Sequence, residues 1–171
     1  IDETIAVYRR IIQQEPDNVE HYRRLVNYLI FTERSDQAEN VLRDTIAAKP
    51  EDLQIKLWLT EFLLKVGNDP ELAEKTLKNY IAQQPEVYEF RFALAQLFFS
   101  QSEHSKAIST LKKIIDIDED GPYGIEARNR MAFYYALTNQ TGKAEKLTEE
   151  VLAIEPVNTT ALVFAAKSKL Q

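Results

Sequence analysis

Apolar and polar residues alternate along most of the chain with the period of an amphipathic α-helix. In the stretch NVEHYRRLVNYLIF, residues 18–31, Tyr22, Leu25, Val26 and Leu29 recur at i, i+3, i+4 and i+7 and so share one helical face. The stretch SDQAENVLRDTIAAKP, residues 35–50, repeats this arrangement with charged side chains on the opposite face. The two stretches predict a pair of helices joined by a short turn.

This helix pair recurs along the chain with a period of 34 to 37 residues. Each second helix carries a small residue near its start, which lets the two helices of a pair cross closely. It ends twelve residues later, in most copies at a Pro, which cannot donate the next hydrogen bond of the ladder. The small residues are Thr4, Ala38, Ala73, Ala107 and Ala144, and the helix-ending residues are Pro16, Pro50, Pro85, Glu119 and Pro156.

Residues near the helix ends agree with these boundaries. Asp69 followed by Pro70 predicts a helix start, because Asp accepts hydrogen bonds from the first turn and Pro suits the first helical position. Asp36 and Glu39 have the spacing of a capping box at another start. Four residues before each helix end lies an aliphatic residue expected to contact the neighbouring pair: Ile12, Ile46, Ile81, Ile115 and Leu152.

Together these features resemble the tetratricopeptide repeat, with Ala early in the second helix and Pro after it followed by acidic or amide residues, as in EPDN, KPED and EPVN. The resemblance implies an all-α fold in which about ten helices form hairpins of a right-handed superhelix, an α-solenoid. Gly67 fits the Gly that the family often has between its two helices, whereas Glu33, Ser102 and Asn139 depart from it. An ordinary helical bundle, in which the recurring phase would be accidental, is the alternative.

The repeats predict one domain over residues 1–171. We expect full repeats at residues 19–52, 53–87, 88–121 and 125–158, a half repeat at 1–18, and the first helix of a further repeat at 159–171. Because the chain begins with Ile and already inside a repeat, we interpret it as part of a longer protein.

The amino-acid composition argues against several classes of partner and site. Hydrophobic residues at 44% and charged residues at 28% are ordinary for a folded domain. No apolar run is long enough to predict membrane insertion. The absence of Cys excludes disulfides and thiolate metal sites. A net charge of −6 argues against a nucleic-acid partner, which would need a surplus of Lys and Arg.

The residues offer little for catalysis. No phosphate-binding Gly-rich loop and no nucleophile elbow occurs. His21 and His104 lack a second ligand at metal-site spacing, so a surface or packing role is expected for both. The acidic run DIDED, residues 116–120, lacks the spacing of a calcium loop. We therefore expect no enzyme, no cofactor and no metal site.

The first helices of such repeats line the concave face, where a partner would bind. Several of their predicted inward positions carry large apolar side chains where a merely solvated surface would carry Lys or Glu, and Arg lies at the edges. Packing of Trp58 and of the Phe residues between adjacent first helices is the alternative. The predicted groove residues are Arg23, Arg24, Asn27, Ile30, Leu57, Trp58, Glu61, Leu64, Phe92, Gln96, Phe99, Asn129, Arg130 and Phe133, with Lys65 beside them.

This groove favours a non-catalytic scaffold that binds a peptide or an amphipathic helix of a protein partner. Two alternatives stay open: a helical-repeat protein that binds RNA, and a regulatory segment attached to a catalytic domain elsewhere in a longer protein. The family's carboxylate-binding clamp is not expected, because Trp58, Glu89 and Ala93 stand where its polar or basic groups would lie. The apolar last helix, TTALVFAAKSKLQ, adds the expectation of a homodimer through terminal helices.

Overall fold

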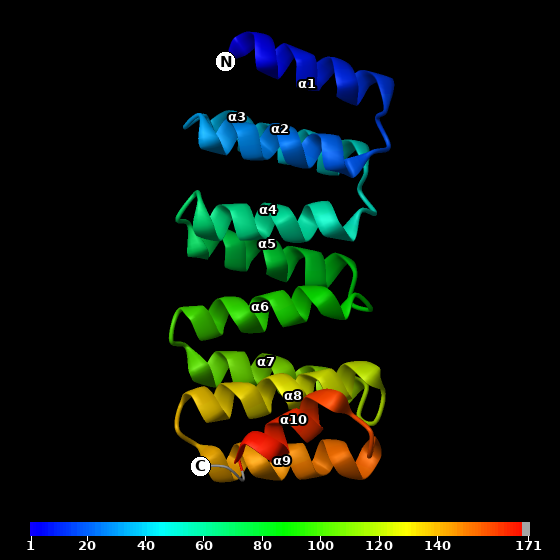
Figure 1. Cartoon of the computed structure of the whole chain (residues 1–171), viewed down its shortest axis with the longest axis vertical. Helices are drawn as coiled ribbons and strands as arrows, with labels where there is room; N and C mark the ends of the chain where they lie inside the picture. Colours follow the sequence, from blue (N-terminus) through cyan, green and yellow to red (C-terminus); the bar gives the residue numbers. More distant parts are fainter. Residues whose placement is uncertain (169–171) are drawn as a thin grey trace. The chain divides into compact units, whose positions relative to one another are not determined.

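The computed structural model describes residues 1–168, and every regular element in this range is an α-helix. Ten helices follow one another in this part of the chain (Figure 1), so the expected all-α class and helix number are confirmed. They are α1 (Asp2–Gln14), α2 (Val19–Phe31), α3 (Ser35–Ala48), α4 (Leu53–Lys65), α5 (Pro70–Gln83), α6 (Tyr88–Ser100), α7 (His104–Ile117), α8 (Pro122–Leu137), α9 (Thr141–Ile154) and α10 (Thr159–Ser168).

The chain divides into two compact units, an N-terminal unit, Ile1–Thr76, and a C-terminal unit, Leu77–Gln171. The division falls within α5. The repeat boundaries expected from the sequence stay a prediction.

In the N-terminal unit α2 packs against both α1 and α3, and α3 also packs against α4. The helices contribute aliphatic side chains and one Phe to a shared core, as their apolar faces predict. Its buried residues include Ile5, Leu25, Val26, Leu29, Leu42, Ile55, Leu59, Phe62 and Leu63.

In the C-terminal unit each of the helices α6 to α10 packs against the next, and α6 also contacts α8. Consecutive antiparallel helices therefore form hairpins, as a repeat of helix pairs requires. The buried residues include Phe90, Leu94, Leu97, Phe98, Leu111, Ile114, Met131 and Val151.

The small residues of the second helices lie where the sequence analysis placed them. Ala38, Ala73, Ala107 and Ala144 are all at most 1% exposed, which agrees with a close crossing of paired helices. Thr4, at the same register in α1, is exposed. Residues that lie the same number of positions from this small residue have the same register and occupy equivalent places in different helices.

The turn inside each hairpin holds one residue in the left-handed conformation. These residues lie five positions before the buried Ala, where Glu33, Ser102 and Asn139 were expected to replace Gly. In the remaining turn the left-handed residue is Asn68 and not Gly67, so the match of Gly67 to the family position was wrong by one residue. After three of these turns the next backbone N–H donates to the carbonyl five residues back, at 2.8–2.9 Å, as in a Schellman motif: Arg34 to Leu29, Glu103 to Phe98 and Gln140 to Tyr135.

Of the two predicted helix starts, the structure confirms one and contradicts the other. Asp69 caps α5, because its Oδ1 accepts a hydrogen bond from the Leu72 backbone N–H at 2.9 Å. The capping box at Asp36 was wrong. Helix α3 already begins at Ser35 without a side-chain cap, and Glu39 pairs instead with Arg43.

The acidic or amide residue two positions after Pro has a structural role. In three copies its side-chain oxygen accepts a hydrogen bond from the first turn of the next first helix. The pairs are Asn18 with the N–H of Glu20 (3.2 Å), Asp52 with that of Ile55 (3.0 Å) and Asn158 with that of Ala161 (3.0 Å).

First helices also contact the backbone just beyond the preceding second helix. A polar side chain of the first helix donates to the carbonyl of the residue two positions after that helix ends. The pairs are Tyr22 with Pro16 (3.0 Å), Arg91 with Pro85 (2.5 Å) and Arg128 with Glu119.

Candidate functional site

The first helices α2 and α4 of the N-terminal unit line an open pocket of about 390 Å³, which we name the α2–α4 pocket. Five of the residues that line it were predicted groove residues, and Gln54 is an addition. Gln54 lies one turn before Trp58, and its polar character gave no reason to select it. The lining residues are Arg23, Asn27, Gln54, Leu57, Trp58 and Glu61.

Opposite charges and one aromatic ring shape the rim of this pocket. The guanidinium group of Arg23 lies 5.7 Å from the ring centre of Trp58, a cation–π distance. Arg23 and Arg24 share a single carboxylate, that of Glu20, at 3.8 and 3.3 Å. This edge therefore has more positive than negative charge.

The opposite side of the pocket is closer to neutral, because Glu61 pairs with Lys65 at 2.6 Å. Ile30 and Leu64, which were also predicted groove residues, are half-buried and do not line the pocket. The structure thus brings together only part of the set predicted on α2 and α4.

In the C-terminal unit two of the predicted groove aromatics are used for packing. Phe92 is 7% exposed, and the guanidinium group of Arg130 covers its ring at 4.5 Å from the ring centre. Phe99 is half-buried and stacks on Tyr134 with ring centres 3.9 Å apart. Burial raises the pKa of Tyr134, and the charge of Arg130 partly offsets this effect.

The other predicted residues of this unit differ in accessibility. Phe133 is 54% exposed, and Gln96 is exposed. Asn129 is half-buried, and its amide donates to Asn158, the cap of α10, at 3.3 Å. The apolar surface that stays accessible on α8 is therefore centred on Phe133, with Leu137 one turn further along the helix at 55% exposure.

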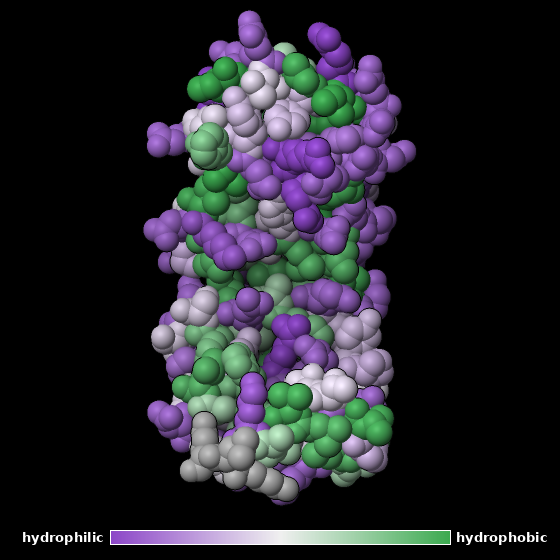
Figure 2. Space-filling view, viewed as in Figure 1, coloured by the Kyte–Doolittle hydropathy of each residue, from purple (hydrophilic) through white to green (hydrophobic). Residues whose placement is uncertain are grey.

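Helix α10 adds exposed apolar side chains near the C-terminal end of the described chain. Leu162 and Val163 are both about half exposed. Figure 2 shows apolar side chains at the surface in the region of α8 and α10. The homodimer expected through terminal helices stays a prediction.

The two His residues lie in local contacts. The ring of His104 is 4.8 Å from that of Phe99. His21 Nε2 is 2.7 Å from the Glu15 carboxylate across the turn between α1 and α2. This hydrogen bond, with a second one from Asn18, lowers the pKa of Glu15.

Residues 1–168 contain no group of three or more His, Asp or Glu side chains that could hold a metal ion. In the same range no helix combines the length and the apolar character that a membrane span needs.

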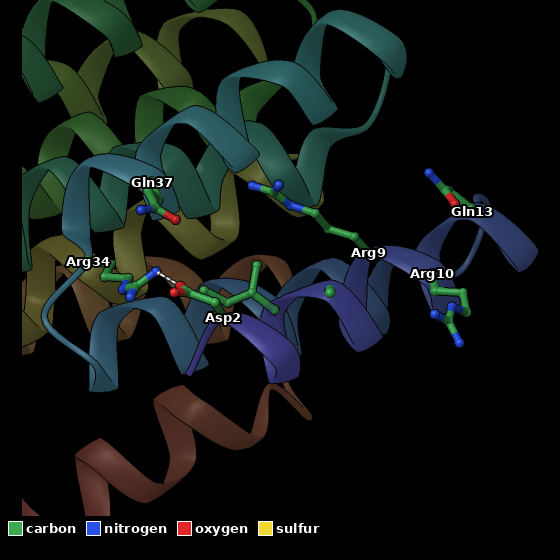
Figure 3. Close-up of a pocket in the computed structure, with 8 residues that line it drawn as sticks. Asp2, Arg9, Arg10, Gln13, Arg34 and Gln37 are labelled. Atoms are coloured by element: carbon green, nitrogen blue, oxygen red, sulfur yellow. Dashed lines mark hydrogen bonds and ion pairs between the residues drawn. The ribbon is translucent and has the colours of Figure 1, made fainter.

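Each unit also has a cleft between successive second helices, which the sequence analysis missed. The α1–α3 cleft, of about 600 Å³, is lined by Asp2, Ile5, Ala6, Arg9, Arg10, Gln13, Arg34 and Gln37 (Figure 3). The α7–α9 cleft, of about 380 Å³, is lined by His104, Ser105, Ile108, Ser109, Lys112, Tyr135, Gln140 and Lys143.

The two clefts occupy the same register of the repeat. Arg9 and Lys112 both lie five residues after the small residue, and each follows an Ile by four positions. At this register α3 has Arg43, with Glu39 four positions before it. Four positions before Arg9 and Lys112 the sequence has an Ile, where α3 has Glu39. This difference indicates from the sequence that the cation has no ion-pair partner one turn earlier in its own helix.

Helix hairpins repeated at this spacing define a helical-repeat protein. Residues 63–122 match the model of the tetratricopeptide repeat family, so the resemblance inferred from the sequence is confirmed. No curated protein was found to match the chain in sequence.

Solved structures of tetratricopeptide-repeat proteins share the fold. TTC0263 from Thermus thermophilus aligns with a TM-score of 0.65 and 17% identity, over 99% of this chain and 91% of that chain. YrrB, described as having an unusual peptide-binding site, aligns with a TM-score of 0.58 and 19% identity, over 98% and 83%. MamA aligns with a TM-score of 0.57 and 21% identity, over 91% and 88%. At these identities the likeness shows the fold alone.

Proposed function

We propose that this protein is a non-catalytic scaffold and that its α2–α4 pocket binds a peptide segment of a protein partner. One observation carries the proposal: the pocket places an apolar surface, Leu57 and Trp58, beside Arg23, which shares the single carboxylate of Glu20 with Arg24. The peptide-binding site named for the structural relative YrrB supports a role of this kind.

The chemistry of the pocket defines the peptide. An apolar side chain would lie against Trp58 and Leu57, and burying such a side chain is worth about 1.5–3 kcal/mol. A carboxylate next to it would pair with Arg23 and Arg24, which prefer planar acidic groups. The side-chain amides of Asn27 and Gln54 can donate to and accept from the peptide backbone.

Phe133 is proposed as a separate apolar contact for a partner on the C-terminal unit, because more than half of its side chain is exposed. Phe92 and Phe99 are not proposed as contacts, since the cover from Arg130 and the stacking on Tyr134 already use their rings.

Fluorescence anisotropy of fluorescein-labelled peptides tests the proposal. The probe carries Leu flanked by Glu, and two matched peptides replace Glu by Lys or Leu by Ser. We expect the Leu–Glu peptide to bind most tightly. Trp58→Ala should weaken its binding about tenfold or more, through the lost apolar contact.

Phe31→Ala is the matched control, because Phe31 ends the same helix α2, is 84% exposed and does not line the pocket. It removes an aromatic side chain without changing the site. Equal affinity of the Trp58→Ala and Phe31→Ala variants would refute the proposal. A labelled single-stranded RNA that binds better than the peptide would favour the RNA-binding alternative.

A further inference from the structure

The α1–α3 cleft of the N-terminal unit holds an excess of positive charge beside apolar side chains. Three guanidinium groups and one carboxylate line it together with two apolar side chains, Ile5, which is 5% exposed, and the exposed Ala6. Arg34 is paired with Asp2 at 2.5 Å. Figure 3 shows this pair bridging the two helices, whereas Arg9 and Arg10 extend from α1 without such a contact. Neither has an ion-pair or hydrogen-bond partner among residues 1–168.

Comparison with α3 explains why Arg9 is unpaired. Arg43 has the same register, and Glu39, one helical turn before it, pairs with it at 2.6 Å. In α1 the residue one turn before Arg9 is Ile5, which cannot form an ion pair. Ile5, at the position where α3 has Glu39, therefore leaves Arg9 without an ion-pair partner and also contributes an apolar side chain to the cleft.

A ligand that fits this cleft carries carboxylates beside an aliphatic side chain, because guanidinium groups bind carboxylates through paired hydrogen bonds. The chain itself exposes such a segment at the end of α7. Ile117 is 57% exposed, and the acidic residues Asp116, Glu119 and Asp120 around it are exposed, with carboxylates that are unpaired within the described part of the chain. Asp118 is already used, since it accepts hydrogen bonds from two backbone N–H groups at the start of α8.

We propose that residues 116–120 of one copy of the chain dock into the α1–α3 cleft of a second copy. Ile117 lies over Ile5, and the acidic side chains pair with Arg9 and Arg10. The two surfaces of this contact differ, so each copy keeps one unused cleft and one unused acidic segment, and copies can add in a row. This contact uses second helices and leaves the α2–α4 pocket accessible to a peptide.

Analytical ultracentrifugation of charge-reversal variants tests this contact. The cleft variant is Arg9→Glu with Arg10→Glu, and the segment variant is Asp116→Lys with Glu119→Lys. At low salt the natural sequence should associate with rising concentration, and each variant alone should associate at least about tenfold more weakly. Association should also weaken at high salt, because the contact rests on exposed charges.

Mixing the two variants gives the sharpest result. The cleft variant keeps its acidic segment for the natural cleft of the segment variant, and its reversed cleft suits the reversed segment of that variant, so the mixture should regain the association that neither variant shows alone. Combining all four reversals in one chain should restore association with the charges exchanged. Circular dichroism confirms that each variant folds.

The matched control is Lys112→Glu with Lys113→Glu. These residues occupy in α7 the register of Arg9 and Arg10, and their reversal changes the net charge equally. It also makes the neighbouring acidic segment more negative, so association should not weaken. The proposal is overturned if the natural sequence stays monomeric at all concentrations, or if this control abolishes association. It is also overturned if association survives in the cleft variant and resists salt, which would indicate an apolar interface such as α10.

Discussion

The left-handed turn residue Glu33 offers a direct test of how the hairpins are built. Its φ is 59°, a conformation that costs an L-residue about 1–2 kcal/mol. Gly adopts it without this cost, but Gly also makes the unfolded chain more flexible by about 0.4–1 kcal/mol. The Glu33 side chain is exposed and has no partner among the described residues, so Glu33→Gly removes no contact. We expect a net stabilisation of about 0.5–1 kcal/mol.

Urea unfolding followed by circular dichroism measures this change as a higher midpoint with an unaltered slope. Glu149→Gly is the matched control. Glu149 is also exposed, but it lies inside α9, where Gly should destabilise by about 1 kcal/mol. If both substitutions destabilise the protein equally, the explanation of the turn by backbone conformation is wrong.

Three further substitutions test packing, electrostatics and capping. Ala107 is 0% exposed at a helix crossing, so Ala107→Leu should destabilise the protein by about 1–3 kcal/mol, and unchanged thermal unfolding would argue against a close crossing. The pKa of Glu15 is lowered from 4.5, chiefly by the hydrogen bond with His21, so its stabilising effect is complete above pH 4.5 and is lost as pH falls through the lowered value. The melting temperatures of the natural sequence and of Glu15→Gln should therefore differ at neutral pH and converge in acid; a constant difference would contradict this. Asn158→Ala removes the cap of α10 at a cost of about 0.5–2 kcal/mol, so amides in its first turn should exchange faster with solvent, and unchanged exchange would contradict the role of the cap.

The repeat itself could be predicted from the sequence because its signals are steric and local. A small residue is needed wherever two helices cross closely, and Pro is excluded from the interior of a helix, so Ala38 and Pro50 mark points that recur from copy to copy. The left-handed position was harder to place. One turn contains an extra residue, and the obvious candidate, Gly67, lies one position before the residue that adopts positive φ.

The groove residues could be predicted only in part, because one face of a first helix contacts both the neighbouring helix and solvent. Sequence spacing selects that face but cannot distinguish an exposed Phe133 from a buried Phe92, whose ring is covered by Arg130 of another helix. The sequence could in principle have predicted that Arg9 and Arg10 lack ion-pair partners. Recognising them required comparing what stands one turn earlier in each copy, since an ion pair within a helix decides whether a cation is available.

Peptide binding in the α2–α4 pocket is the central functional claim, and Trp58, the single Trp of the chain, reports on it. Its side-chain indole N–H gives one resonance in a ¹⁵N–¹H spectrum. Titration with the Leu–Glu peptide should shift this resonance saturably, together with backbone amides of α2 and α4. A resonance that stays in place while the peptide binds elsewhere, or does not bind, would contradict the account.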